Sequence, residues 1–223
     1  MDRTNSGRLP GASKARGPYA VGDERRRRIL DAAVDHFAQW GFHASSLARI
    51  AKSVGVTQGG LLHHFRGKED LLVSVLERSE EQDAESFFAT GFDSAADCFQ
   101  RLLALVDLNT RRPGRTRMFN VLAGEASEPG HPAHAFFRRR YDTLATRLAE
   151  TLQAAVESGE LRPDTDCATV AREVIAVMDG TQLQWALAPE SVDMTHRLRT
   201  YLDRLYGAVS AGATALPPTP GAA

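Results

Sequence analysis

The stretch from Ser45 to Phe65 constrains the fold of this chain most, because its apolar pattern changes phase once, at residues 54–56. Before that point the apolar residues recur at spacings of three and four and share one helix face: Leu47, Ile50, Ala51 and Val54. After it, Thr57 can cap a second short helix, whose buried side is Leu61 and Phe65. The pattern predicts two short helices joined by a tight turn at Gly55.

The opposite side of the second helix combines small and polar residues: Gln58, Gly59, Gly60, Leu62, His63 and His64. Glycines let a helix approach another surface closely, and amide and imidazole groups donate hydrogen bonds. This combination suits a helix that enters the major groove of DNA.

The charge of the chain is distributed unevenly. Residues 1–70 carry 12 Lys and Arg against 7 Asp and Glu, whereas residues 71–223 carry 15 against 21. A basic first part joined to an acidic remainder indicates that only the first part meets a polyanion. The alternative is a basic disordered tail without a partner, since residues 1–22 hold part of the surplus.

Several other classes of protein are disfavoured. We expect a cytoplasmic protein, because the sequence has no membrane span and no signal peptide. Cys98 and Cys167 fit buried free thiols, with one disulfide as the alternative. We expect neither an enzyme nor a cofactor, since there is no Gly-rich phosphate loop, no G-x-S-x-G motif and no Cys/His cluster at metal spacing. His131 and His134, separated by Pro132, are interpreted as capping or surface groups rather than metal ligands.

Two flanking helices complete the basic region. Asp23 is predicted to cap a helix that runs to Trp40 and ends at Gly41, with Arg25–Arg28 in its first turns. Lys68 is predicted to begin a long helix. A cation beside the free backbone amides of a helix start makes a site for an external phosphate.

Residues 29–72, ILDAAVDHFAQWGFHASSLARIAKSVGVTQGGLLHHFRGKEDLL, resemble the N-terminal DNA-binding domain of the tetracycline-repressor (TetR) family of bacterial transcriptional regulators. The resemblance implies that eight residues lie at or beside double-stranded DNA, with Lys68 holding phosphate: Ser46, Thr57, Gln58, Gly60, Leu62, His63, His64 and Lys68. The family usually has a tyrosine where this chain has Leu62. A phosphate hydrogen bond is therefore missing, and Leu62 either contacts a thymine methyl or lies on the surface.

The remainder of the chain predicts helices only. Ser94 or Asp93 is expected to cap one of them, and residues 164–166 introduce another. The predicted fold is all-α, with a three-helix head followed by about six further helices. We expect a disordered tail at residues 1–22, a DNA-binding domain at 23–84, a ligand-binding and dimerisation domain at 85–209, and a second disordered tail at 210–223.

A small-molecule effector is expected in the acidic part, because TetR-like regulators commonly bind a ligand there. Aromatic, methionine and amide side chains form the candidate pocket, with ordinary core packing as the alternative for each residue. The candidates are Phe99, Met118, Phe119, Asn120, Phe137, Tyr141, Met178 and Gln182.

The last two helices resemble the dimerisation elements of the family. The expected interface residues are Gly180, Thr181, Gln184, Trp185, Leu198, Tyr201 and Leu202. The run DGTQLQW at residues 179–185 also resembles a subgroup that includes betaine-synthesis regulators, from which we infer no ligand.

We therefore expect a sequence-specific transcriptional regulator that binds a palindromic operator as a homodimer and has no membrane partner. By the resemblance, it is a repressor released by a small molecule. A non-specific DNA-binding protein and an enzyme with a helical core are the two alternatives.

Overall fold

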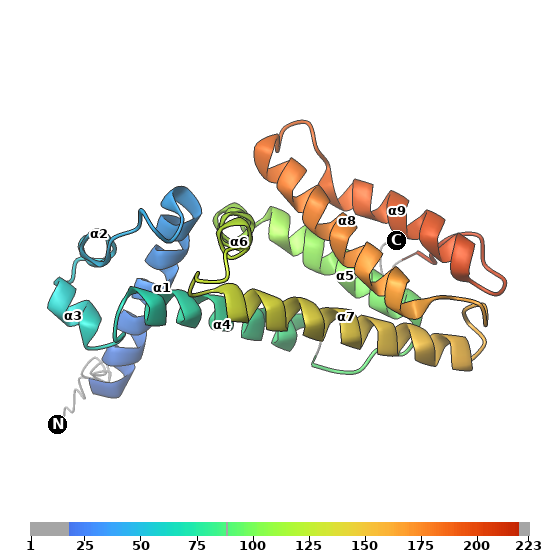
Figure 1. Cartoon of the computed structure of the whole chain (residues 1–223), viewed down its shortest axis with the longest axis horizontal. Coiled ribbons are helices and arrows are strands. Elements are labelled where there is room, and N and C mark those ends of the chain that lie inside the picture. Colours follow the sequence, from blue (N-terminus) through green and yellow to red (C-terminus); the bar gives the residue numbers. More distant parts are fainter. Residues whose placement is uncertain (1–17, 88, 219–223) are drawn as a thin grey trace, which may run out of the picture.

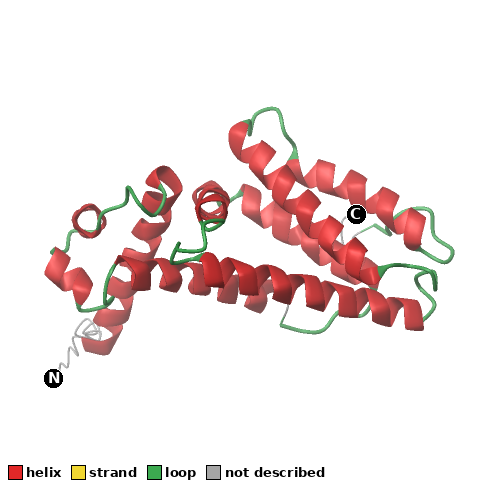
Figure 2. Cartoon of the chain, viewed as in Figure 1, coloured by secondary structure: helices red, strands yellow, loops and turns green. Residues whose placement is uncertain are grey.

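The computed structural model describes residues 18–87 and 89–218, in which every regular element is a helix apart from one isolated bridge, Leu161 to Ser210 (Figures 1 and 2). The helices are α1 (Pro18–Trp40), α2 (Leu47–Ser53), α3 (Gln58–Leu62), α4 (Lys68–Phe87), α5 (Ala95–Thr110), α6 (Pro113–Glu125), α7 (His134–Glu157), α8 (Cys167–Leu187) and α9 (Met194–Val209). The predicted all-α fold is confirmed. None of the described helices is both long enough and apolar enough to cross a membrane.

Helices α1, α2 and α3 and the first turns of α4 form a head at one end of the molecule (Figure 1). The head closes around fully buried side chains: Ile29, Leu30, Phe37, Ile50, Leu61, Phe65, Leu71 and Leu72. Gly55 makes the predicted turn with φ +72°, a backbone conformation that is strained for residues with a side chain. The apolar spacing read from the sequence therefore matches the buried faces of α2 and α3.

The remaining helices form an elongated body that is continuous with the head. Met118 and Leu122 of α6 and Phe136 of α7 belong to the same buried cluster as the head residues. A second cluster lies among α5, α7, α8 and α9 and is centred on Phe99, Leu152 and Leu198. Helix α4 runs from the head along the body (Figure 1), so one rigid element joins the two regions.

The first helix begins earlier than predicted. Helix α1 starts at Pro18, so Asp23 is not its cap and lies inside the helix. The expectation of a disordered segment up to residue 22 is wrong for residues 18–22, because proline is well suited to the first turn of a helix. The part of that prediction covering residues 1–17 lies outside the described residues.

The segment after α9 is also more ordered than predicted. Leu216 is buried in the second cluster, and the side-chain amide of Gln100 donates to the carbonyl oxygens of Pro217 and Pro218 at 3.1 and 3.3 Å. A disordered tail from residue 210 is therefore wrong for residues 210–218, which lie against α5. The Ala, Gly and Pro content of residues 210–218 predicts disorder, but the buried side chain of Leu216 holds this segment against the body.

Candidate DNA-binding face and effector cavity

Helix α3 presents the predicted polar face to solvent. The hydroxyl oxygen of Thr57 accepts a hydrogen bond from the backbone N–H of Gly60 at 3.0 Å and caps the helix. Leu61 is fully buried, whereas Gln58, Gly59, Leu62 and His63 are exposed and His64 is half-buried. The face available to a partner therefore consists of one amide, two imidazoles and a leucine around a flat glycine surface.

The N-terminal half of α1 packs against this region through arginines. The guanidinium of Arg28 donates to the carbonyl oxygen of Val54 at 2.8 Å, and Arg26 lies over the ring of Phe65, 5.0 Å from its centroid. Arg25 to Arg28 are all exposed. The head therefore carries positive charge beside α3, where a polyanion would be attracted.

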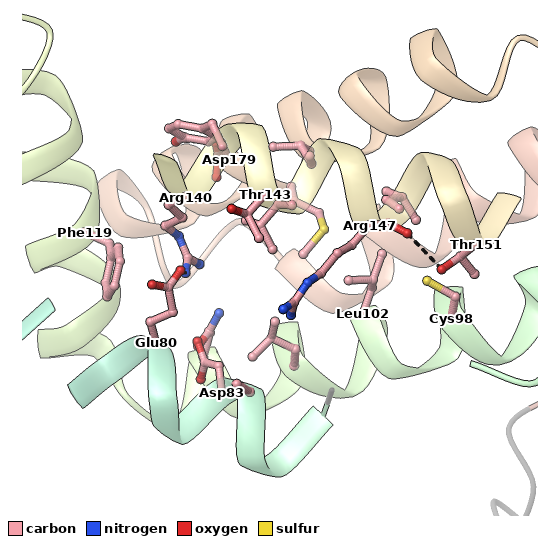
Figure 3. A pocket seen from close by; sticks show the side chains of 18 of the residues that line it. Glu80, Asp83, Cys98, Leu102, Phe119, Arg140, Thr143, Arg147, Thr151 and Asp179 are labelled. Carbon is pink, nitrogen blue, oxygen red and sulfur yellow. Dashed lines mark hydrogen bonds and ion pairs between the residues drawn. The ribbon is translucent and has the colours of Figure 1, made fainter. Parts of the chain in front are cut away.

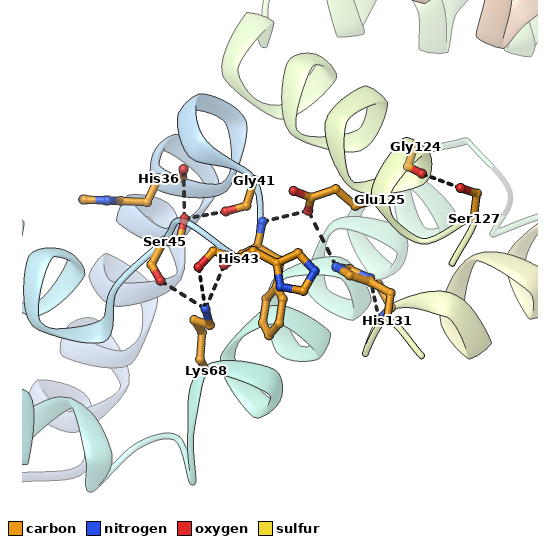
Figure 4. A network of polar contacts seen from close by, with 11 residues as sticks. His36, Gly41, His43, Ser45, Lys68, Gly124, Glu125, Ser127 and His131 are labelled. Atoms are coloured by element: carbon orange, nitrogen blue, oxygen red, sulfur yellow. Dashed lines mark hydrogen bonds and ion pairs between the residues drawn. The ribbon is translucent and has the colours of Figure 1, made fainter. Parts of the chain in front are cut away.

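Lys68 is the first residue of α4, as predicted, and its ammonium makes its hydrogen bonds within the head. Its ammonium donates to the carbonyl oxygens of Phe42, His43 and Ser45 at 2.9, 3.2 and 3.2 Å (Figure 4). It also lies 4.3 Å from the centroid of the Phe42 ring. Since an ammonium has three donors, these carbonyls account for all of them. Lys68 thus fastens the turn between α1 and α2, hereafter the 41–45 turn, onto the start of α4.

The same turn is held from the other side by Glu125, the last residue of α6. One carboxylate oxygen accepts from the backbone N–H of Phe42 at 2.8 Å (Figure 4). Gly41 has φ +66°, and a Cβ atom at this position would lie only 2.0 Å from the other carboxylate oxygen. The positive φ favours glycine at residue 41, and a side chain there would also displace the Glu125 carboxylate from the N–H of Phe42.

His131 lies beside Glu125 in the loop between α6 and α7. It is buried, its Nδ1 accepts from the backbone N–H of Ala133 at 3.2 Å, and its Nε2 lies 3.6 Å from Glu125. Burial lowers the pKa of this imidazole, and the Glu125 carboxylate opposes the shift. His131 is therefore buried rather than on the surface, and it does not cap α7, at whose start no side chain makes a capping hydrogen bond. No group of three metal-binding side chains occurs among the described residues.

Ser46, the remaining residue expected at DNA, stands at the N-cap position of α2 without a capping hydrogen bond from its side chain. Its neighbour Ser45 is buried and donates to the carbonyl oxygens of Gly41 and His36 at 2.6 and 3.2 Å. Ser46 therefore keeps a free hydroxyl at the start of α2, whereas Ser45 belongs to the interior.

The body contains a cavity of about 1280 Å³ with walls from α4, α5, α6, α7 and α8 (Figure 3). Six of the predicted pocket residues line it: Phe119, Asn120, Phe137, Tyr141, Met178 and Gln182. Phe99 and Met118 do not, because both are fully buried in the two apolar clusters. For these two residues the prediction is wrong. Met118 and Phe119 are neighbours on α6, so their side chains point in different directions.

The predicted amides of the cavity bond mainly to each other. The Gln182 amide nitrogen donates to the Asn120 side-chain oxygen at 3.3 Å, and Asn120 donates to the Gln182 backbone oxygen at 3.4 Å. The charged wall residues were not predicted from the sequence. Arg115 pairs with Asp83, with one contact of 2.8 Å, and Arg140 pairs with Glu80 at 3.0 Å. Each ion pair joins α4 to a later helix, so its two residues are far apart in the sequence and no local sequence pattern predicts the pair.

The predicted dimer residues on α8 and α9 divide into two groups. Leu198 and Leu202 are fully buried within the second cluster and Thr181 is 8% exposed, so these three side chains cannot form much contact with a second chain. Gly180, Trp185 and Tyr201 are partly exposed and Gln184 is exposed. The largest exposed apolar side chains of α8 are instead Leu183 and Leu187, at 49% and 78%.

A short helix with an exposed polar face, carried by a basic head and joined to a helical body with a large cavity, defines a DNA-binding regulator. Comparison with known proteins assigns the family. The sequence model of "Bacterial regulatory proteins, tetR family" matches residues 29–75, and that of "BetI-type transcriptional repressor, C-terminal" matches residues 99–207. The chain belongs to the TetR family of transcriptional regulators, which are not enzymes.

Relatives and solved structures agree with this assignment. The chain is 27% identical over 194 residues to the transcriptional regulator AcrR of Shigella flexneri, covering 84% of this chain and 90% of the relative. It is 27% identical over 186 residues to TtgR of Pseudomonas putida, covering 81% and 89%. The SmeT–triclosan complex has the same fold, with a TM-score of 0.77, 21% identity and coverage of 88% and 96%.

Proposed function

We propose that the protein is a homodimeric repressor that binds a palindromic operator and is released by a small molecule bound in the cavity. The observation that carries this proposal is the course of α4. Its first residue, Lys68, is fastened to the head, and its later residues Glu77, Glu80 and Asp83 line the cavity. A change in the cavity walls is therefore transmitted along one helix to the DNA-binding head. As a regulator of bacterial genes, the protein would act in the cytoplasm.

The proposed DNA contacts centre on α3. Gln58, His63 and His64 would reach base edges or phosphates in the major groove, while Gly59 and Gly60 allow close approach. Thr57, Ser46 and Leu62 border that surface. Lys68 is assigned a positioning role, because its donors are already bonded to the 41–45 turn.

Two heads in one dimer would face a two-fold symmetric site. A dimer places its recognition helices in major grooves about one helical turn apart, which calls for an inverted repeat. The exposed apolar residues Leu183 and Leu187 on α8 support an interface on this side of the body. An effector that shifts α4 would alter the distance between the two heads of the dimer. The heads could then no longer bind both half-sites of the operator at the same time.

The experiment that tests this function is selection of a bound duplex from a random library, followed by anisotropy titrations at increasing salt. A specific regulator keeps a preference of about a thousandfold or more for the selected duplex over a scrambled one. A purely electrostatic binder selects no sequence and loses all affinity with a steep salt dependence. The second outcome would replace the proposed function by non-specific DNA binding.

Replacing His63 by alanine is expected to weaken binding to the selected duplex about tenfold, because a base or phosphate contact worth 1–3 kcal/mol is lost. His63 is exposed at the C-cap of α3, so stability should not change. His196→Ala on α9, also exposed, removes an imidazole far from the head and serves as the control. Equal affinity for both variants and the unmodified protein would contradict DNA contact by His63.

Replacing Leu183 by glutamate is expected to lower dimerisation and operator affinity together, each about tenfold or more, because a charge cannot be buried in an apolar interface without a partner. Analytical ultracentrifugation measures the first effect and anisotropy the second. Thr146→Glu, at an exposed position of α7, controls for the added charge. A monomeric variant with full operator affinity would contradict the dimeric mode of binding.

A further inference from the structure

The cavity carries an excess of negative charge. Its walls include seven carboxylates and four arginines, and no lysine or histidine, which leaves a net charge of −3. Two of the arginines are neutralised within the wall, since Arg115 pairs with Asp83 and Arg140 pairs with Glu80. Glu77, Glu81, Asp93 and Glu150 are exposed at the rim, where solvent screens them. The three carboxylates that are not exposed face two paired arginines, which leaves one carboxylate over, and low-dielectric walls focus its field so that the interior favours a cation.

Asp179 on α8 is the carboxylate best placed to receive one. It accepts a hydrogen bond from the hydroxyl of Tyr141 on α7 at 2.7 Å and makes no ion pair with any described residue. Burial raises the pKa of Asp179, whereas the hydrogen bond from Tyr141 and the charge of nearby Arg140 oppose the shift. Because Arg140 is already paired with Glu80, a bound cation would supply a counter-charge of its own to Asp179.

A row of aromatic rings continues from Tyr141, the hydrogen-bond partner of Asp179, although Arg140 also lies near Asp179 and over the Phe119 ring. Phe137 packs at 6.5 Å from the Tyr141 ring and at 6.0 Å, edge to face, from Phe119, and Met178 precedes Asp179 on α8. Aromatic faces attract cations and also cover the hydrophobic part of a ligand. Asn120 and Gln182, which would orient a neutral polar ligand, are bonded to each other.

We propose that the effector is an organic cation with a hydrophobic body, bound with its positive charge at Asp179 and its body against Phe137 and Tyr141. This inference rests on the proposed function only where it calls the ligand an effector, that is, a molecule whose binding releases the protein from DNA. Arg147 is the feature that favours an anion instead. It is exposed, extends into the cavity and forms no ion pair with described residues (Figure 3). Asp179 attracts a ligand charge more strongly than Arg147 does, because Asp179 is less exposed to water and its charge is screened less.

Two probes of similar size and opposite charge separate these possibilities: tetraphenylphosphonium and tetraphenylborate. Isothermal titration of the full-length protein without DNA is expected to show tetraphenylphosphonium binding about tenfold or more tightly than tetraphenylborate. Asp179→Asn should weaken tetraphenylphosphonium binding about tenfold or more, since a buried counter-charge is removed. The asparagine oxygen can still accept from Tyr141, so the fold should be retained.

Glu150→Gln is the matched control, because it removes the same charge from an exposed position on the cavity wall. Its effect should stay within about twofold. Preferential binding of tetraphenylborate, lost in Arg147→Gln, would overturn the proposal in favour of an anion. Unchanged tetraphenylphosphonium affinity in Asp179→Asn would overturn the placement at Asp179.

A measurement on the unmodified protein covers the case in which Asp179→Asn fails to fold. Affinity for tetraphenylphosphonium should fall as the pH is lowered through the raised pKa of Asp179, because the protonated acid carries no charge. The groups nearest to Asp179 are Tyr141, whose own pKa is raised by burial so that it stays neutral, and Arg140, which is paired with Glu80. A flat profile would contradict the proposal. If tetraphenylphosphonium binds but operator affinity does not change, the proposed release from DNA is contradicted, while the assignment of an organic cation to the cavity still stands.

Discussion

Lys68→Met is expected to unfold the head at a lower denaturant concentration and to reduce operator affinity about a hundredfold. The ammonium bonds to three carbonyl oxygens of the 41–45 turn, and a hydrogen bond to a charged group contributes about 1.5–3 kcal/mol. Methionine keeps a side chain of similar length but has no donor. The turn would then be released from α4, and α2 and α3 would lose their fixed orientation toward DNA.

Lys52→Met makes the same change at an exposed lysine of α2 and controls for the loss of one positive charge. Chemical denaturation followed by circular dichroism, together with operator titration, distinguishes two roles for Lys68. A positioning role predicts that stability and affinity fall together in Lys68→Met. If stability equals that of the unmodified protein while affinity falls, Lys68 contacts phosphate directly, as the family resemblance implied.

The local features of the fold could be predicted because neighbouring residues determine them. Thr57, Ser94 and Asp166 each accept a backbone hydrogen bond at the start of the helix that their position predicted. The phase change around Gly55 likewise indicated the turn between α2 and α3. These predictions depend on spacings of at most four residues, which are visible in the chain.

The cavity and the joint between head and body could be predicted only in part. Phe119 lines the cavity while the adjacent Met118 is buried, and the direction of α6 relative to its neighbours decides between them. The contact of Glu125 with Phe42 joins residues 83 positions apart, and nothing in the local sequence indicates it. The sequence predicts Lys68 at a helix start, but its hydrogen-bond partners lie in the 41–45 turn, more than 20 residues earlier in the chain, and no local spacing indicates them.

Glu125→Ala is expected to lower the free energy of unfolding by about 2 kcal/mol, because the N–H of Phe42 loses its acceptor in a part-buried site. The truncation also removes the carboxylate that packs against Gly41. Glutamine at residue 125 keeps an oxygen that can accept the same hydrogen bond. Glu125→Gln should therefore cost less than about 1 kcal/mol, and the difference between the two variants measures the contact of α6 with the 41–45 turn.

Ser127→Ala provides a control two residues away, since its hydroxyl donates only to the carbonyl oxygen of Gly124 on the exposed surface and does not touch the head. Its effect should stay within about 0.5 kcal/mol. An equal loss in Glu125→Gln and Glu125→Ala would show that the negative charge beside His131, rather than the acceptor for Phe42, stabilises the joint. A loss confined to Glu125→Ala would instead mean that the hydrogen bond to the N–H of Phe42, in addition to the packing of Met118 and Leu122, fixes α6 to the DNA-binding head, so that Phe119 and Asn120 in the cavity wall are coupled to the 41–45 turn.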